Sequence, residues 1–295
     1  MIIIKRKVKL IIFVLVFIIA SPIIILYANG DIFGGGWSLL KTGGIYISDA
    51  PVGSDIYLNS KFTNNTSFFD RNILIKSLKK GKYEVSVKKE SYNTWTKKIT
   101  VFDNLVSEAN VFMLPNVINI REIYRYVLPN SGTPTSTITK SKNPEYLEIL
   151  ETFTKKTQTI IKTSSTSSID FKGNLGTKAS PIMDGKIGLW SEGGRILSAW
   201  FGNNDLAPRY FCDVSNCTKT IQVIDIGIKP TRLNFLPEYS GVAVIAFQNK
   251  IFAIQIEQNP EKVAQIIYKG NVPDLRIYNN ILYIKDGNYI AEVLL

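Results

Sequence analysis

The stretch that decides the fold runs from Leu78 to Trp95 and reads Leu-Lys-Lys-Gly-Lys-Tyr-Glu-Val-Ser-Val-Lys-Lys-Glu-Ser-Tyr-Asn-Thr-Trp. Within it, Tyr83, Val85 and Val87 alternate with polar residues, which is the two-residue period of a half-buried β-strand. The Lys-Gly pair before this strand and the polar residues after it are turn formers, and a second apolar run starts at Trp95. The stretch therefore predicts a β-hairpin on a small apolar core.

Short strands of the same kind are expected throughout residues 44–114. In each of them apolar residues alternate with polar ones, and turn formers separate the runs. The alternating apolar residues outside the hairpin are Ile45 and Ile47, Ile56 and Leu58, Ile73 and Ile75, and Val111 and Met113. About six or seven short strands in roughly seventy residues, with no stretch of helical period, predict a compact β-sandwich.

This region also carries spaced turn and aromatic motifs. They are Ser48-Asp-Ala-Pro-Val-Gly-Ser54, Ile56-Tyr-Leu-Asn59, Leu78-x-x-Gly-x-Tyr-x-Val85 and Lys89-x-x-Tyr-x-x-Trp95. Their order and spacing resemble the PEGA domain family. In that family a Pro-x-Gly-x turn leads into one strand and a Leu-x-Pro-Gly-x-Tyr turn into a later one, and a Gly-Tyr pair and an aromatic residue follow.

The motifs depart from the family pattern in their turns. Val52 and Ser54 replace the family's Glu and Ala, Lys80 replaces the usual Pro, Ser91 replaces the usual Gly, and Thr66-Ser67 stands where the family has Thr-Pro. The pattern of strands is intact. The resemblance implies a small extracytoplasmic β-domain of the cell envelope, and it brings no catalytic residues.

The N-terminus has the composition of a membrane anchor. An uncharged run from Leu10 to Ala28 follows a short basic segment that contains Lys5, Arg6, Lys7 and Lys9. The run is close to the roughly 20 residues that a helix needs to cross a bilayer, and Pro22 is tolerated in lipid. Because the cations lie only before the run, the N-terminus is expected in the cytoplasm and the rest of the chain outside.

A cleaved signal peptide is the alternative interpretation of the same segment. The apolar core of a signal peptide is usually about 7–15 residues long, and this run is longer. Leu26-Tyr-Ala28 also lacks the small residues of a cleavage site. An uncleaved anchor is therefore favoured, and either interpretation places the remaining chain in the same exported compartment.

Residues 145–295 predict a second all-β region. Many short strands are expected to follow one another, among them residues 157–162 and 209–212. Leu189-Trp-Ser-Glu-Gly193 and Asn234-Phe-Leu-Pro-Glu238 lie 45 positions apart. Tyr146-Leu-Glu-Ile149 is expected to be a strand at about that distance before Trp190. A period near 45 with four strands per unit resembles a degenerate β-propeller. An irregular sandwich or an open stack of meanders is the alternative, and it would leave strand edges in need of a partner or a cover.

These observations predict an all-β protein with an N-terminal transmembrane helix. The expected parts are a cytoplasmic tail (1–9), a transmembrane anchor (10–28), a Gly-rich linker (29–43), a PEGA-like sandwich (44–115), a connecting segment (116–144) and a propeller-like domain (145–295).

The net charge of +11 is concentrated around the hairpin. A candidate face for an anionic ligand comprises Lys79, Lys80, Lys82, Lys88, Lys89, Lys97 and Lys98. Such a face would bind an anionic cell-envelope polymer or a lipid headgroup, or another envelope protein. Nucleic acid is not expected outside the cell. A solvated strand face in a lysine-rich chain is the plainer interpretation of the same residues.

Catalysis is not predicted. The chain has no histidine, which removes the commonest general base and metal ligand. Ser-x-x-Lys pairs occur only where a helix is not expected, so a serine–lysine mechanism is disfavoured. No cofactor or metal is expected. The alternative is a glycan-processing enzyme that uses carboxylates of the distal domain; the candidates are Asp184, Asp205, Asp213 and Asp225.

The two cysteines, Cys212 and Cys217, lie five positions apart. Outside the cell they would close a small loop, which contributes about 2 kcal/mol on the chain-entropy estimate. Two free thiols are the alternative. A zinc site is disfavoured, because no further ligands are patterned nearby. Taken together, the sequence predicts a non-catalytic, membrane-anchored cell-envelope protein that acts in surface binding or scaffolding.

Overall fold

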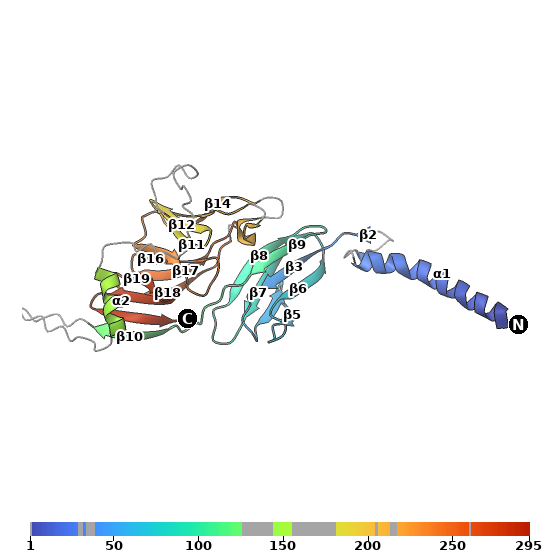
Figure 1. Ribbon diagram of the computed structural model, residues 1–295, viewed down its shortest axis with the longest axis horizontal. Coiled ribbons are helices and arrows are strands. Elements are labelled where there is room, and N and C mark those ends of the chain that lie inside the picture. The colour runs from blue at the N-terminus through green and yellow to red at the C-terminus, as the bar shows by residue number, and fades with distance from the viewer. Residues whose placement is uncertain are drawn as a thin grey trace, which may run out of the picture. The chain divides into compact units, whose positions relative to one another are not determined.

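The computed structural model of the chain describes residues 2–28, 32–33, 39–125, 144–154, 181–203, 206–212, 217–259 and 261–295 (Figure 1). Over these residues the fold is all-β, as the sequence predicted, apart from the N-terminal helix α1 (Ile2–Ala28), a short helix α2 (Pro144–Thr154) and a 3-10 turn. The chain divides into two compact units. The first holds residues 1–90 and 94–111, and the second holds residues 91–93 and 112–295.

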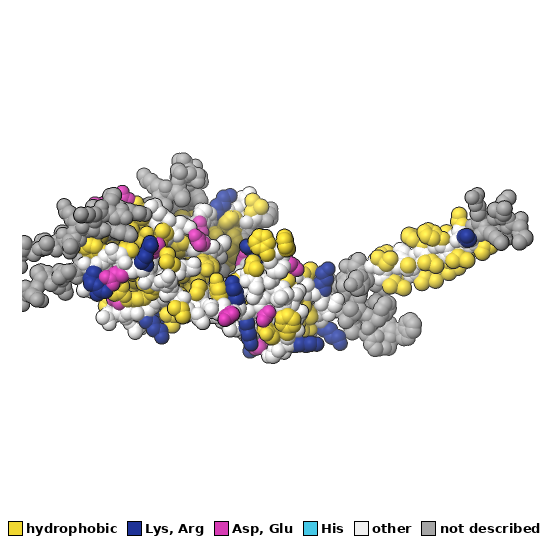
Figure 2. Space-filling view, turned by 90° about the horizontal axis from the view of Figure 1, so that it is seen from below, with side chains coloured by type: hydrophobic (Ala, Val, Ile, Leu, Met, Phe, Trp, Pro, Cys, Tyr) yellow, Lys and Arg dark blue, Asp and Glu magenta, His cyan; other side chains and the backbone are white. Residues whose placement is uncertain are grey.

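Helix α1 is apolar on every side. Its segment Lys7–Ile25 has a mean hydropathy of 2.9 and none of it is buried, and Figure 2 shows hydrophobic side chains along its length. Among the described helices, this one alone is long and apolar enough to cross a membrane. A membrane anchor and an N-terminal signal sequence share these properties. A two-stranded ladder follows it, formed by β1 (Ile32–Phe33) and β2 (Leu39–Leu40).

The β-sandwich of the first unit consists of seven strands in two sheets. These strands are β3 (Gly43–Ser48), β4 (Asp55–Leu58), β5 (Lys61–Asn65), β6 (Ile73–Leu78), β7 (Gly81–Lys88), β8 (Trp95–Val101) and β9 (Val106–Asn110). One sheet has the order β6-β3-β9, in which β3 and β9 are parallel, and the other has the order β5-β4-β7-β8. The hairpin read from the sequence is β7–β8, with Tyr83 opposite Ile99 and Val87 opposite Trp95.

The core of the sandwich follows the alternation of the sequence. Val85, Val87 and Trp95 are fully buried, as are Ile45 and Ile47 in the other sheet. Because successive side chains of a strand point to opposite faces, each sheet packs one apolar face into the core and turns the other face to solvent. At the β4–β5 turn, Asn59 and Ser60 have positive φ angles of 49° and 66°, the type I′ geometry that suits the twist of a two-residue hairpin.

The described residues of the second unit form three four-stranded antiparallel sheets. The first contains β11 (Ile182–Asp184), β12 (Ile187–Glu192), β13 (Arg195–Trp200) and β14 (Thr220–Asp225), and the second contains β15 (Arg232–Phe235), β16 (Val242–Phe247), β17 (Lys250–Gln255) and β18 (Ala264–Lys269). The third contains β19 (Asp274–Tyr278), β20 (Ile281–Asp286), β21 (Tyr289–Leu294) and β10 (Asn119–Arg125), with β10 paired to β21.

The sheets of the second unit stack face to face around the middle one. One apolar cluster contains Val244 and Ile251 of the middle sheet with Ile284 of the third. Another contains Ile245 of the middle sheet with Leu189 of the first. The middle sheet is therefore buried on both faces, which explains the continuous apolar sequence of β16. Helix α2 packs on the third sheet through a smaller cluster of its own.

Two sequence expectations for this unit were wrong. The expected strand at 146–149 is part of helix α2, and the expected strand at 209–212 is a 3-10 turn at Arg209–Phe211. Strand β10 lies within the expected connecting segment and pairs with β21 of the third sheet. The expected strand at 157–162 lies outside the described residues. The propeller form of this unit stays a prediction, since the described sheets form a stack of three.

Two short segments of the sequence-predicted sandwich belong to the second unit. Residues 91–93 and 112–114 pack there, with Phe112 2% exposed and Leu114 fully buried in the cluster of Val244. Gln265 of β18 binds both segments. Its Nε2 donates to the carbonyl of Phe112 at 2.7 Å, and its Oε1 accepts from the backbone N–H of Leu114 at 2.7 Å and from Nδ2 of Asn93 at 3.4 Å.

Candidate functional site

The seven candidate lysines do not form one face. Lys79 and Lys80 lie in the turn between β6 and β7, and both are exposed. Lys82 is an exposed residue at the start of β7. Lys88 lies at the other end of the same strand, six positions or about 20 Å further along. Figure 2 likewise shows Lys and Arg side chains at several separate places on the sandwich.

Lys97 is not a surface residue. It is 4% exposed, because it shares the buried face of β8 with Trp95 and Ile99. Its Nζ lies 5.7 Å from the centroid of the Trp95 ring. The sequence placed it on the anionic-ligand face, and the alternation of the strand takes it to the opposite side. Lys89, in the β7–β8 turn, is only partly exposed.

The exposed face of the four-stranded sheet is the best-organised surface that this unit presents. Phe62, Tyr57, Ser86 and Thr96 lie opposite one another in a row that crosses all four strands. The rings of Tyr57 and Phe62 meet edge to face, with centroids 5.8 Å apart. The hydroxyls of Ser86 and Thr96 are hydrogen-bonded at 2.9 Å. The row therefore consists of two neighbouring aromatic rings followed by two neighbouring hydroxyl side chains.

Two lysines flank this row on the same face. The Nζ of Lys88 lies 4.8 Å from the centroid of the Tyr57 ring, within the range of a cation–π contact. Lys98 lies opposite Glu84, and Lys88 lies opposite Asp55, so acidic residues temper the positive charge. The face therefore combines stacking surface, hydroxyls and mixed charge, and only two of the seven lysines flank its row.

The aromatic–hydroxyl row was missed in the sequence. Tyr57 alternates with Ile56 and Leu58, a signal that it points away from the core. Phe62 is 54% exposed, although an isolated phenylalanine in a short strand gives no such indication. The sheet order β5-β4-β7-β8 brings Phe62, Ser86 and Thr96 into one row with Tyr57. Local sequence patterns do not reveal this order.

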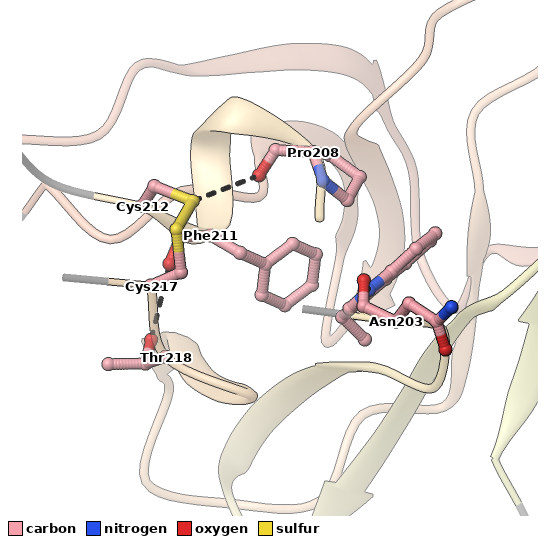
Figure 3. Close-up of a disulfide and its surroundings, with 7 residues drawn as sticks. Asn203, Pro208, Phe211, Cys212, Cys217 and Thr218 are labelled. Atoms are coloured by element: carbon pink, nitrogen blue, oxygen red, sulfur yellow. Dashed lines mark hydrogen bonds between the residues drawn. A yellow bond between two sulfur atoms is a disulfide. The ribbon is translucent and has the colours of Figure 1, made fainter. Parts of the chain in front are cut away.

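Cys212 and Cys217 form a disulfide in the structure, with their Cα atoms 3.9 Å apart. Figure 3 shows the bond beside the 3-10 turn, with the ring of Phe211 pointing away from the sulfur atoms. Phe211 is fully buried in the cluster shared by the first and middle sheets. Next to it, burial raises the pKa of Tyr210 to about 12. The Tyr210 hydroxyl therefore stays protonated at neutral pH, and this region is part of the structural core.

Two carboxylates of the described distal region, Asp286 and Asp225, accept hydrogen bonds within the fold. Asp286 is 7% exposed and accepts hydrogen bonds from the Tyr268 hydroxyl at 2.9 Å and from two backbone N–H groups. Asp225 is exposed and accepts from the backbone of Gly227. Asp184 is also exposed, and Asp205 and Asp213 lie outside the described residues. Within the described ranges, no three metal-ligating side chains gather.

A shallow groove of about 650 Å³ runs along β14 in the second unit. Lys262 lines it and donates from its Nζ to the carbonyl oxygens of Gln222 and Val223, the latter at 2.7 Å. This contact covers carbonyls of an edge strand at a β-bulge, where the register against β13 shifts. Bulges and lysines are common means of protecting strand edges, so the groove is explained by the fold.

The comparisons with known families concern the sandwich. No curated protein matches the chain. Residues 42–114 match the model of the PEGA domain, and this range contains strands β3 to β9. The match confirms the resemblance read from the turn and aromatic motifs. The seven-stranded sandwich of this chain is a PEGA domain.

Proposed function

We propose that the protein is a non-catalytic, single-pass membrane protein whose PEGA domain binds an anionic, sugar-containing polymer of the cell envelope. The observation that carries this proposal is the row of Phe62, Tyr57, Ser86 and Thr96 with Lys88 beside it, exposed on a rigid sheet. Aromatic rings offer an apolar surface for the faces of sugar rings, hydroxyls exchange hydrogen bonds with sugar hydroxyls, and lysines attract acidic groups.

The rest of the chain supports a location outside the cytoplasm. Helix α1 is exposed and apolar over a length that fits a bilayer, and its cations lie only at its N-terminal end. Disulfides persist mainly in oxidising compartments, which suits the Cys212–Cys217 bond. In this proposal residues 1–9 are cytoplasmic and both β-units are extracytoplasmic.

The location is tested with the full-length protein in cells. We expect it to stay in the membrane fraction in alkaline carbonate, and we expect external protease to remove the β-units once any outer barrier is opened. An Ile18→Lys variant should insert less completely, because a lysine at the centre of a spanning helix costs about 2.5–3.5 kcal/mol. Release of the unaltered protein by carbonate, or full protection from protease, would contradict the proposed topology.

The ligand class is tested by retention on immobilised polygalacturonate, a chain of sugar rings that each carry a carboxylate. We expect retention at low salt and loss at high salt. A Phe62→Ala, Lys88→Gln variant should bind about five- to thirtyfold more weakly, because each exposed contact contributes about 0.5–1 kcal/mol. A Lys219→Gln, Lys229→Gln variant changes exposed lysines of the second unit and serves as the control. Equal weakening by both variants would assign binding to charge alone and contradict the aromatic face.

A further inference from the structure

We propose a second contact surface: the end of the PEGA domain at which the chain arrives from α1 rests on anionic phospholipid headgroups of the membrane that α1 crosses. This inference rests on the proposed membrane location. It concerns lysines that the polymer-binding face does not use. It also gives the domain a defined orientation, with one end toward the lipid.

The pairing of the strands determines which residues share this end. Gly43, the first residue of β3, lies opposite Leu78, the last residue of β6. The turn between β8 and β9 closes over the same point, since the backbone N–H of Asn104 donates to the carbonyl of Thr42 at 2.9 Å and that of Gly44 donates to Leu105 at 3.0 Å. A Cβ on Gly43 would lie 2.2 Å from the carbonyl oxygen of Phe102. The linker entry and the two turns are thus one compact end.

Positive charge dominates this end. Its exposed lysines are Lys41, Lys76, Lys79, Lys80 and Lys82. Asp103, in the β8–β9 turn, is an exposed acidic residue at the same end. Two aliphatic side chains are exposed beside that turn, Leu105 at 43% and Val106 at 52%. Exposed lysines together with exposed aliphatic residues are the composition that binds anionic headgroups and the outermost acyl chains.

The covalent tether keeps this end close to the membrane. Fourteen residues separate Ala28 from Gly43, so the two are at most about 50 Å apart even with the chain fully extended. A tethered surface meets the bilayer at a high effective concentration. Weak electrostatic contacts, which act over a Debye length of about 8 Å at physiological salt, are then sufficient to hold the domain.

The opposite end of the domain offers a competing surface. Phe68 and Phe69 are 71% and 96% exposed in the loop before β6. Ile73, at the start of β6, pairs with Ile47 near the end of β3, far from Gly43. Among these loop residues the basic side chain is Arg71, placed over the Phe68 ring, and Asp70 is its neighbour. Charge complementarity therefore favours the lysine-rich end for an anionic surface.

The test uses the full-length protein in nanodiscs of phosphatidylcholine alone or mixed with phosphatidylglycerol. A water-soluble acetylating reagent reports the accessibility of each lysine by mass spectrometry. We expect Lys41, Lys76 and Lys82 to react several-fold more slowly in the anionic discs, and Lys88 and Lys98 to react equally in both. High salt should remove the difference. Lys79→Gln with Lys80→Gln should reduce it, and Lys219→Gln with Lys229→Gln should leave it unchanged.

The outcomes separate this inference from the proposed function. If Lys41, Lys76 and Lys82 react equally fast in both kinds of nanodisc while α1 remains inserted, the headgroup contact is overturned. A lipid-dependent contact that a Phe68→Ser, Phe69→Ser variant abolishes, and the lysine variant does not, would overturn it in favour of the opposite end. Failure of the protein to remain with nanodiscs of either composition at high salt would instead contradict the membrane location itself.

Discussion

Replacing Gln265 by alanine is expected to lower the free energy of unfolding of the second unit by about 2–4 kcal/mol. Gln265 is 7% exposed, and its amide pairs with the carbonyl of Phe112 and the N–H of Leu114, both at 2.7 Å. Removing the amide leaves two buried backbone groups unpaired, and each such group costs about 1–3 kcal/mol. The shorter side chain also leaves space in a packed region.

Urea denaturation followed by tryptophan fluorescence measures this loss, since Trp190 and Trp200 both lie in the second unit. Gln222→Ala is the matched control, because that glutamine is an exposed residue of β14 and surface substitutions usually change stability by less than about 0.5 kcal/mol. Gln265→Glu should also destabilise, because it places a carboxylate oxygen against the carbonyl of Phe112. Equal midpoints for Gln265→Ala and Gln222→Ala would show that the hydrogen bonds contribute little.

Replacing Trp95 by alanine is expected to cost the PEGA domain about 3–5 kcal/mol. Trp95 is fully buried opposite Val87, at the start of β8. The total stability of a small domain is about 5–15 kcal/mol or less, so the variant should populate unfolded forms of the sandwich at moderate temperature. The sequence-derived hairpin should then lose its protection as one unit.

Amide hydrogen exchange measures this effect directly at β7 and β8, without relying on the deleted fluorophore. Phe62→Ala removes an aromatic ring from the exposed face of the same sandwich and should leave exchange in the hairpin nearly unchanged. Trp95→Phe should give an intermediate loss, because it retains part of the buried area. Exchange in Trp95→Ala no faster than in Phe62→Ala would mean that the buried ring is not what stabilises the hairpin.

The sandwich was predictable from the sequence because its strands bury only one face. Alternation at Val85 and Val87, with turn formers at each end, specifies both the strand and its orientation. The second unit was harder to predict. The middle sheet is buried on both faces, so β16 shows a continuous apolar run without alternation, and such a run does not reveal how sheets stack. The offset of 45 residues relates Trp190 in the second strand of one sheet to Phe235 in the first strand of the next, so it does not mark equivalent positions.

Helix α2 shows how a short pattern misleads. Leu147 to Ile149 alternates like a strand, but Ile149, Leu150 and Phe153 follow the spacing of a helical face. Pro144 occupies the first helical position, where its missing N–H costs nothing. In the structure Ile149 and Phe153 are buried against Tyr283 and Ile290 of the third sheet. The longer segment from Pro144 to Phe153 therefore indicates a helix, whereas residues 146–149 alone suggested a strand.

The sequence alone determined the apolar N-terminal helix, the strands of the PEGA domain and the inward direction of its aliphatic residues, because hydrophobic burial acts through periods of a few residues. Only the tertiary structure decided where the seven candidate lysines lie. Two flank an aromatic row, three lie at the linker end, one lies in a turn and Lys97 is buried. These places depend on which strands pair and at what register, and those pairings join residues far apart in the chain that no local pattern relates.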